Sequence, residues 1–143
     1  LDADRFLPPL PSTIAVDSRL QRREDFVPNE RAVHRAAERQ YDLSSMRKVL
    51  NALVPPMLER ARAEALQQAG ERAAQATAAA DALLSAEIAR LEALARVNPG
   101  VRPEEIAALH AEREQLLAVL PTARPRLDAL RLVASPDFLS IRR

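Results

Sequence analysis

The chain has 143 residues, enough for one ordinary domain or for an elongated helical piece with a small core. Apolar residues make up 48% of it but aromatic residues only 3%, so burial must come from aliphatic side chains and alanine, and we expect thin helix-on-helix packing. The 21 basic and 20 acidic residues leave a formal net charge of +1, which gives no general attraction to nucleic acid or anionic membrane, and the lack of cysteine excludes disulfides and thiolate metal sites.

The amino-terminal segment is rich in proline. Residues 6–11, FLPPLP, contain three prolines in six residues, which favours an extended, polyproline-like conformation and predicts a linker or a docked arm. Residues 13–17, TIAVD, carry the β-branched side chains typical of a short strand, and a polar turn and a charged run follow them. We therefore expect residues 1–28 to form an extended arm with one strand.

A helical region is predicted over residues 29–120. A helical pattern occupies residues 29–37, and Asp42 is a suitable N-cap for a second helix, whose apolar residues recur at three- and four-residue spacings. Pro55 and Pro56 each lack a backbone donor, so this second helix should end or kink there. Residues 57–97 contain no proline and are dominated by strong helix formers, which predicts one long helix.

The second half of the long helix and the segment after it each carry an apolar stripe. Leucines and isoleucines recur on one face of both arms, so the arms should pack against each other as an antiparallel hairpin. Such a stripe could also be a groove for a partner, but its first role is to hold the hairpin together. The predicted hairpin seam consists of Leu84, Ile88, Leu91, Ala95, Ile106, Leu109, Leu116 and Leu120.

The reversal of the hairpin is predicted at residues 98–102. Asn98 precedes a proline, Pro99 cannot extend a helical hydrogen-bond ladder, and Gly100 permits a positive φ for the change of direction. Pro103 suits the first position of the returning helix, where two glutamates in the first turn complement the helix dipole.

The last segment is ambiguous. Residues 126–134, RLDALRLVA, follow two prolines. Some of their apolar residues have the three-residue spacing of a helix, and some alternate with charged residues as in a strand. We favour a strand within residues 126–134 that pairs with residues 13–17, so that residues 121–143 form this strand and a tail. The expected fold is mainly α, with a long antiparallel helical hairpin on a small base where the chain ends form a two-stranded β element. Because the chain begins at Leu1 and enters a proline-rich segment, we expect residues 1–143 to be one C-terminal-type domain of a larger protein.

No catalytic or cofactor-binding pattern is present. Glycine occurs only at positions 70 and 100, so neither a GxxxxGK[ST] nor a GxGxxG phosphate loop can be built. His34 and His110 have no partner at metal-ligand spacing, and no GxSxG elbow surrounds a serine. We therefore expect no catalytic, cofactor-binding or metal-binding residues in this chain.

Three stretches resemble a known family. SAEIARLEALARVNPGVRPEEI at residues 85–106, RLDALRLV at 126–133 and RFLPPLP at 5–11 resemble the C-terminal region of the bacterial RapA (HepA) family of RNA polymerase-associated proteins. The resemblance is strongest over residues 85–133. It implies a parent Swi2/Snf2-type ATPase motor that binds core RNA polymerase and recycles it during transcription. It also implies that ATP and magnesium belong to motor domains elsewhere in that parent, so no catalytic residue is carried over.

Two hypotheses about function follow. In the first, the chain is the non-catalytic C-terminal scaffold or docking domain of a RapA-like polymerase recycling factor, cytoplasmic and monomeric as a fragment. Its partners would be the parent's other domains or core RNA polymerase, without a membrane or strong direct nucleic-acid contact. In the second, the chain is a free-standing structural coiled coil or stalk-like interaction protein, for which the alanine-rich residues 57–82 are the best support.

Overall fold

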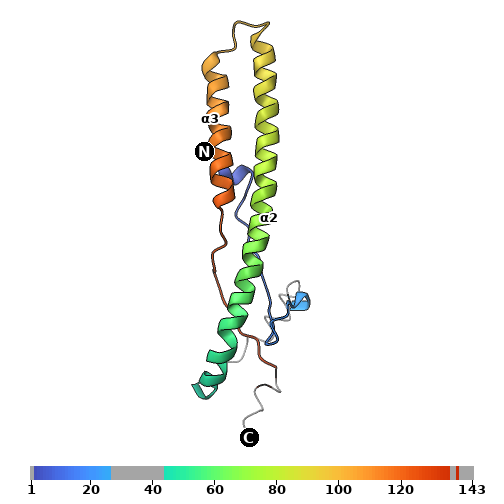
Figure 1. Cartoon of the computed structure of the whole chain (residues 1–143), viewed down its shortest axis with the longest axis vertical. Helices are drawn as coiled ribbons and strands as arrows, with labels where there is room; N and C mark the ends of the chain where they lie inside the picture. The colour runs from blue at the N-terminus through green and yellow to red at the C-terminus, as the bar shows by residue number, and fades with distance from the viewer. Residues whose placement is uncertain (1, 27–43, 136–137, 139–143) are drawn as a thin grey trace. The chain divides into compact units, whose positions relative to one another are not determined.

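The computed structural model describes residues 2–26, 44–135 and 138, and over these it is mainly α-helical. Two long helices, α2 (Arg47–Ala95, 49 residues) and α3 (Pro103–Val119, 17 residues), run antiparallel and side by side, as predicted (Figure 1). Within these described ranges, four short 3-10 turns accompany them: η1 (Ala3–Arg5), η2 (Glu24–Phe26), η3 (Ser44–Met46) and η4 (Leu120–Thr122). The helical pattern predicted at residues 29–37 and the predicted cap at Asp42 lie outside the described residues.

The chain divides into two compact units, and the division falls inside α2. Unit 1 contains Leu1–Pro11 and Leu66–Pro125, and unit 2 contains Ser12–Ala65 and Arg126–Arg143. In the part of the chain that the structure describes, no helix is both long enough and apolar enough to cross a membrane.

Unit 1 is built around the hairpin formed by α2 from Leu66 onward and by α3. The strong helix formers of this stretch explain its regular helices. A small apolar cluster lies between the helices, and it consists of Ala76, Ala80, Leu84, Leu116 and Leu120. Small side chains on α2 therefore face large ones on α3, which is the thin packing that the composition predicts.

α2 continues through the two prolines at which we predicted its end or a kink. Pro55 and Pro56 both lie inside Arg47–Ala95, so the predicted end is wrong. Each proline removes one rung of the hydrogen-bond ladder, namely the bond to the carbonyl four residues earlier. Those carbonyls belong to Asn51 and Ala52, which are exposed residues. Water can solvate both carbonyls, so the helix persists.

The predicted strand at residues 13–17 is reduced to one bridge within unit 2. Val16 forms an isolated antiparallel bridge with Arg22, because the chain reverses immediately after it. The Asp17 carboxylate causes the reversal: its Oδ1 accepts the backbone N–H groups of Arg19 and Gln21, both at 2.9 Å. Leu20 completes the turn with a φ of 62°, in the left-handed region.

The predicted pairing of residues 126–134 with residues 13–17 is wrong. Residues 126–134 form neither helix nor strand, and Val16 already bridges to Arg22. Within the described ranges, the bridge between Val16 and Arg22 is the only β-pairing, and residues 126–134 take no part in it. The two-stranded base that the sequence suggested does not form there.

Candidate functional site

The hairpin seam of unit 1 contains the buried apolar cluster of the described chain. Four of the eight predicted seam residues are buried, with exposed fractions of 4% for Leu84, 6% for Ile88, 0% for Leu116 and 2% for Leu120. The other four, Leu91, Ala95, Ile106 and Leu109, are only half-buried. The half-buried residues lie toward the reversal, so the seam is tightest at the end away from it.

Three alanines extend the seam beyond the residues predicted from sequence. Ala73, Ala76 and Ala80 on α2 are 3%, 5% and 0% exposed, although the predicted seam began only at Leu84. A methyl group buries little area, so an alanine-rich helix shows only a weak apolar stripe. The three- and four-residue spacing of Ala73, Ala76, Ala80 and Leu84 is the signal that could have identified this face.

The amino-terminal arm docks on the hairpin. Ala3, Phe6 and Leu7 pack against the apolar cluster, as does Leu109 of α3. The guanidinium of Arg72 donates a hydrogen bond of 3.1 Å to the carbonyl oxygen of Pro8, which fixes the arm beside α2. The arm thus supplies the aromatic and aliphatic volume that the alanines of α2 lack.

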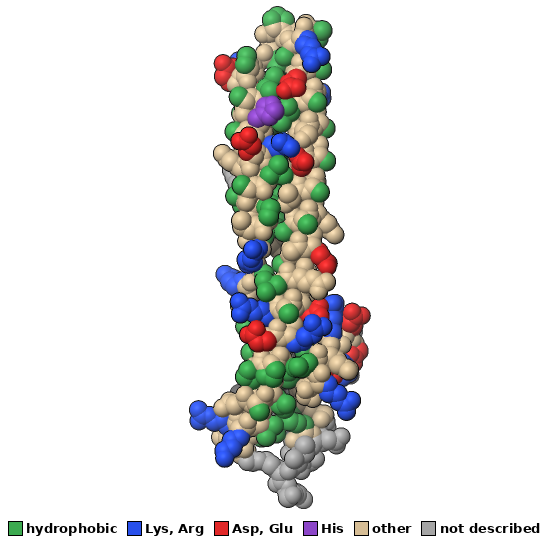
Figure 2. All heavy atoms as spheres, in the orientation of Figure 1, with side chains coloured by type: hydrophobic (Ala, Val, Ile, Leu, Met, Phe, Trp, Pro, Cys, Tyr) green, Lys and Arg blue, Asp and Glu red, His purple; other side chains and the backbone are tan. Residues whose placement is uncertain are grey.

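Polar side chains link the two helices outside the seam. Arg113 on α3 donates from Nε to Oδ1 of Asp81 on α2 at 2.6 Å, and both side chains are partly exposed. Nearer the reversal, Nε2 of His110 lies 3.6 Å from Oε1 of Glu92. Figure 2 shows basic, acidic and histidine side chains among apolar ones near this end of the hairpin. These pairs align the helices along their length.

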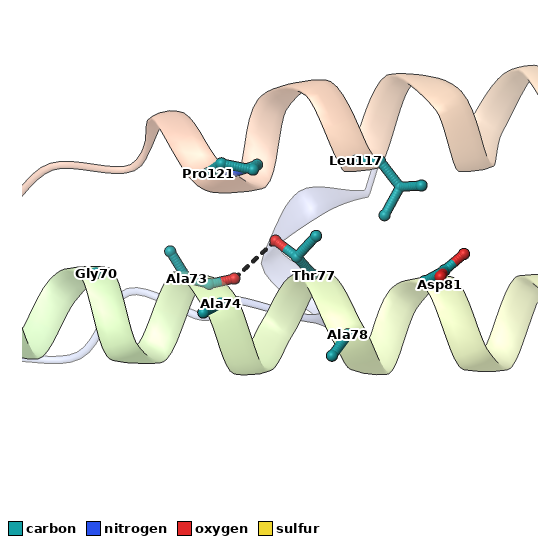
Figure 3. A pocket seen from close by; sticks show the side chains of 8 residues that line it. All are labelled: Gly70, Ala73, Ala74, Thr77, Ala78, Asp81, Leu117 and Pro121. Carbon is teal, nitrogen blue, oxygen red and sulfur yellow. Dashed lines mark hydrogen bonds between the residues drawn. The ribbon is translucent and has the colours of Figure 1, made fainter.

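A shallow open groove of about 420 Å³ runs along the hairpin at the end away from the reversal (Figure 3). Its lining is mostly small and apolar, and consists of Gly70, Ala73, Ala74, Thr77, Ala78, Asp81, Leu117 and Pro121. The hydroxyl of Thr77 donates to the Ala73 carbonyl at 2.7 Å, so it is already used within α2. The groove can accept an apolar surface but presents few free polar groups to a ligand.

The reversal differs from its prediction in one respect. Gly100 does not have a positive φ, so the conformational freedom of glycine is not what the turn uses. Instead, its N–H donates to Oδ1 of Asn98 at 2.9 Å, and a Cβ at this position would lie 3.0 Å from that same oxygen. Glycine therefore leaves room for the Asn98 side chain. Pro99 lies in the turn between them, and Pro103 begins α3 as predicted.

Two carboxyl groups of the described residues have lowered pKa values. Arg90 hydrogen-bonds to Glu87 and lowers the pKa of that carboxyl, and Arg23 does the same for the pKa of Asp25. Both are exposed pairs of neighbouring residues. Among the described residues, no group of three or more histidine, aspartate or glutamate side chains could hold a metal ion.

Comparison with known proteins identifies the family. A family model described as the RNA polymerase recycling family C-terminal matches residues 1–135. The chain belongs to the RNA polymerase recycling family. The match is to the C-terminal domain of that family, and it takes in the arm, the hairpin and residues 126–134.

Relatives in this family carry the name RNA polymerase-associated protein RapA. The proteins from Pectobacterium carotovorum, Serratia proteamaculans and Yersinia pestis are each 38% identical to the chain over 136 residues. These matches cover 93% of this chain but only 14% of each relative. The chain therefore spans about one seventh of the length of the relatives it matches. No solved structure shows a significant match.

Proposed function

We propose that this chain is a non-catalytic docking domain of a longer RNA polymerase recycling protein. The observation that carries the proposal is the family match over residues 1–135, which includes the whole hairpin. The chain's partners would be other domains of the longer protein and core RNA polymerase. In this proposal residues 1–143 act as one domain, and ATP and magnesium are bound elsewhere in the longer protein.

The chemistry of the described residues supports docking over catalysis. The strongest polar contacts, such as that of Arg113 with Asp81, are already satisfied within the chain. No buried side-chain nitrogen or oxygen in the described part lacks a hydrogen-bond partner. The surface instead offers the apolar groove and exposed aliphatic side chains such as Leu83 and Val97.

The relatives' name supports RNA polymerase as a partner. Each is called an RNA polymerase-associated protein, and the chain aligns with them over 93% of its length. The near-zero net charge supports a protein partner over bare nucleic acid, because nucleic-acid affinity depends on neutralising phosphates. The alternative of a free-standing coiled coil is weaker, because α3 folds back along α2 and buries the seam within one chain.

The test is a titration of the fluorescently labelled chain with core RNA polymerase at physiological salt, with the mass of the chain measured by light scattering. We expect a monomer that binds saturably. The variant Ala78→Arg puts a charge in the groove, and Ala82→Arg is its control on an exposed position outside the groove. Weaker binding of the first variant alone would locate the contact.

Two results would contradict the proposal. A monomer that does not bind polymerase would restrict the chain to contacts within the longer protein. A dimer that ignores polymerase would favour the coiled-coil alternative.

A further inference from the structure

Residues 126–134 form the most exposed apolar segment of the described chain. Four of its side chains are large and aliphatic, with exposed fractions of 72% for Leu127, 57% for Leu130, 45% for Leu132 and 46% for Val133. Single exposed aliphatic residues are ordinary, but four within seven consecutive positions are typical of a surface that is covered in its working state.

The backbone of the segment forms neither helix nor strand in the structure. Along an extended chain, side chains alternate between two faces. The even positions place Leu130, Leu132 and Ala134 on one face after Arg126 and Asp128, and the odd positions place Leu127, Ala129 and Val133 on the other with Arg131 among them. A strand that is mostly apolar on both faces is typical of a sheet covered on both sides, and not of a sheet edge open to water.

The described residues contain no sheet for the segment to join, since their one β-pairing is the isolated bridge between Val16 and Arg22. It nevertheless lies inside the region that matches the family, which extends to residue 135. The chain spans only 14% of its relatives' length, so most of such a protein lies outside the structure. The sheet that accepts the segment can therefore come from that remainder.

We infer that residues 126–134 are a β-strand that inserts into a sheet formed by another part of the longer protein. Backbone hydrogen bonds to two neighbouring strands would supply the pairing, and leucine and valine side chains would be buried on both faces of that sheet. This inference rests on the proposed function in one respect, since both treat the chain as one part of a longer protein.

The test is hydrogen–deuterium exchange on the isolated chain and on a chimera. The chimera is full-length RapA from Pectobacterium carotovorum in which the matching 136-residue region is replaced by this chain. Amides of residues 126–134 should exchange at least about 100-fold more slowly in the chimera than in the isolated chain, because paired strand amides exchange only on opening. The peptide of unmodified RapA that aligns with residues 126–134 gives the reference for a correctly folded protein.

Proline variants test the two-sided pairing. Asp128→Pro and Arg131→Pro remove N–H groups that point to opposite sides of a strand, and both side chains are exposed. Asp128→Ala and Arg131→Ala are matched controls that keep the N–H groups. We expect both proline variants to lose most of the protection and both alanine variants to keep it.

Several outcomes would overturn the inference. Fast exchange in both the chimera and unmodified RapA would show that no sheet accepts the segment. Loss of protection in only one proline variant would place the strand at an edge, with one neighbour. Slow exchange in the isolated chain would indicate pairing within the monomer, or with a second copy if the mass doubled. None of these measurements uses RNA polymerase, so a failure of this inference can be distinguished from a failure of the proposed polymerase binding.

Discussion

Arg113 and Asp81 join the two arms of the hairpin across 32 positions of sequence. The Arg113 Nε donates to Asp81 Oδ1 at 2.6 Å, and the Ser85 hydroxyl donates to the same oxygen at 3.3 Å. The pair lies beside the buried seam, where one fixed contact between side chains sets the alignment of α3 along α2. Its geometry is specific, although its exposure to water limits its strength.

The Arg113 to Asp81 contact should contribute modestly to stability. In a double-mutant cycle of Arg113→Met and Asp81→Ala, we expect a coupling free energy of about 0.5–1 kcal/mol, since partly exposed ion pairs are screened by water. Urea unfolding of the four proteins measures it. Raising the salt concentration should reduce the coupling, and a coupling unaffected by salt would contradict an ionic origin.

The buried leucines should carry most of the hairpin's stability. Leu116 is 0% exposed, so Leu116→Ala should lower the free energy of unfolding by about 3 kcal/mol through lost burial and a residual cavity. Val119→Ala, at a position 44% exposed on the same helix, is the control and should cost far less. Thermal and urea unfolding measure both. Equal effects of the two variants would mean that the seam does not form.

Larger side chains on the alanine face of α2 should lower the stability of the chain. Ala80 is fully buried against α3, so Ala80→Leu should destabilise the chain by about 1–3 kcal/mol through overpacking. Ala79→Leu introduces the same side chain at the adjacent, exposed position and should change stability by less than about 0.5 kcal/mol. If the two variants proved equally stable by urea unfolding, α2 and α3 would not be in close contact at Ala80.

Replacing Gly70 and Gly100 by alanine should change the stability of the chain in opposite directions. A Cβ at Gly70 would meet nothing within 4 Å, so Gly70→Ala should stabilise α2 by about 0.5–1 kcal/mol. Gly100→Ala should destabilise the chain, because its Cβ would crowd Asn98 Oδ1. In an Asn98→Ala background that penalty should disappear. A penalty that persists in this background would assign another role to Gly100.

The Glu87 carboxyl should titrate below its ordinary range. The hydrogen bond from Arg90 lowers the pKa of Glu87, so Arg90→Gln should raise it, as measured by carbon NMR of the carboxyl group. A lowered pKa in the folded state adds stability above the unfolded pKa, and that stability is lost as the pH falls through the folded pKa. Arg96→Gln is the control and should leave the titration unchanged.

The sequence predicts the large features of the hairpin well. Leucine and isoleucine at helical spacing indicate both arms, and Pro99 and Pro103 locate the reversal because proline restricts the backbone wherever it lies. These are local effects, independent of the rest of the fold. The same reasoning gives the buried positions Leu84 and Leu116 correctly.

The features missed from sequence depend on distant or solvent contacts. The burial of Ala76 and Ala80 depends on α3 and on the docked arm, and the spacing of these alanines gives only a weak signal because a methyl group buries little area. The Asp17 side chain captures two backbone amides and turns the chain, which overrides the strand propensity of the preceding residues. The role of Gly100 depends on the rotamer of Asn98, which the sequence does not specify.

The passage of α2 through Pro55 and Pro56 has a consequence for how the helix unwinds. Two consecutive missing rungs separate the turns that begin at Arg47 from the ladder that resumes at Met57. Local opening that begins at the amino-terminal end of α2 can therefore stop at the prolines without breaking any later backbone hydrogen bond. Pro56, with φ fixed near the helical value, leaves the following helix with a start that is already in helical conformation.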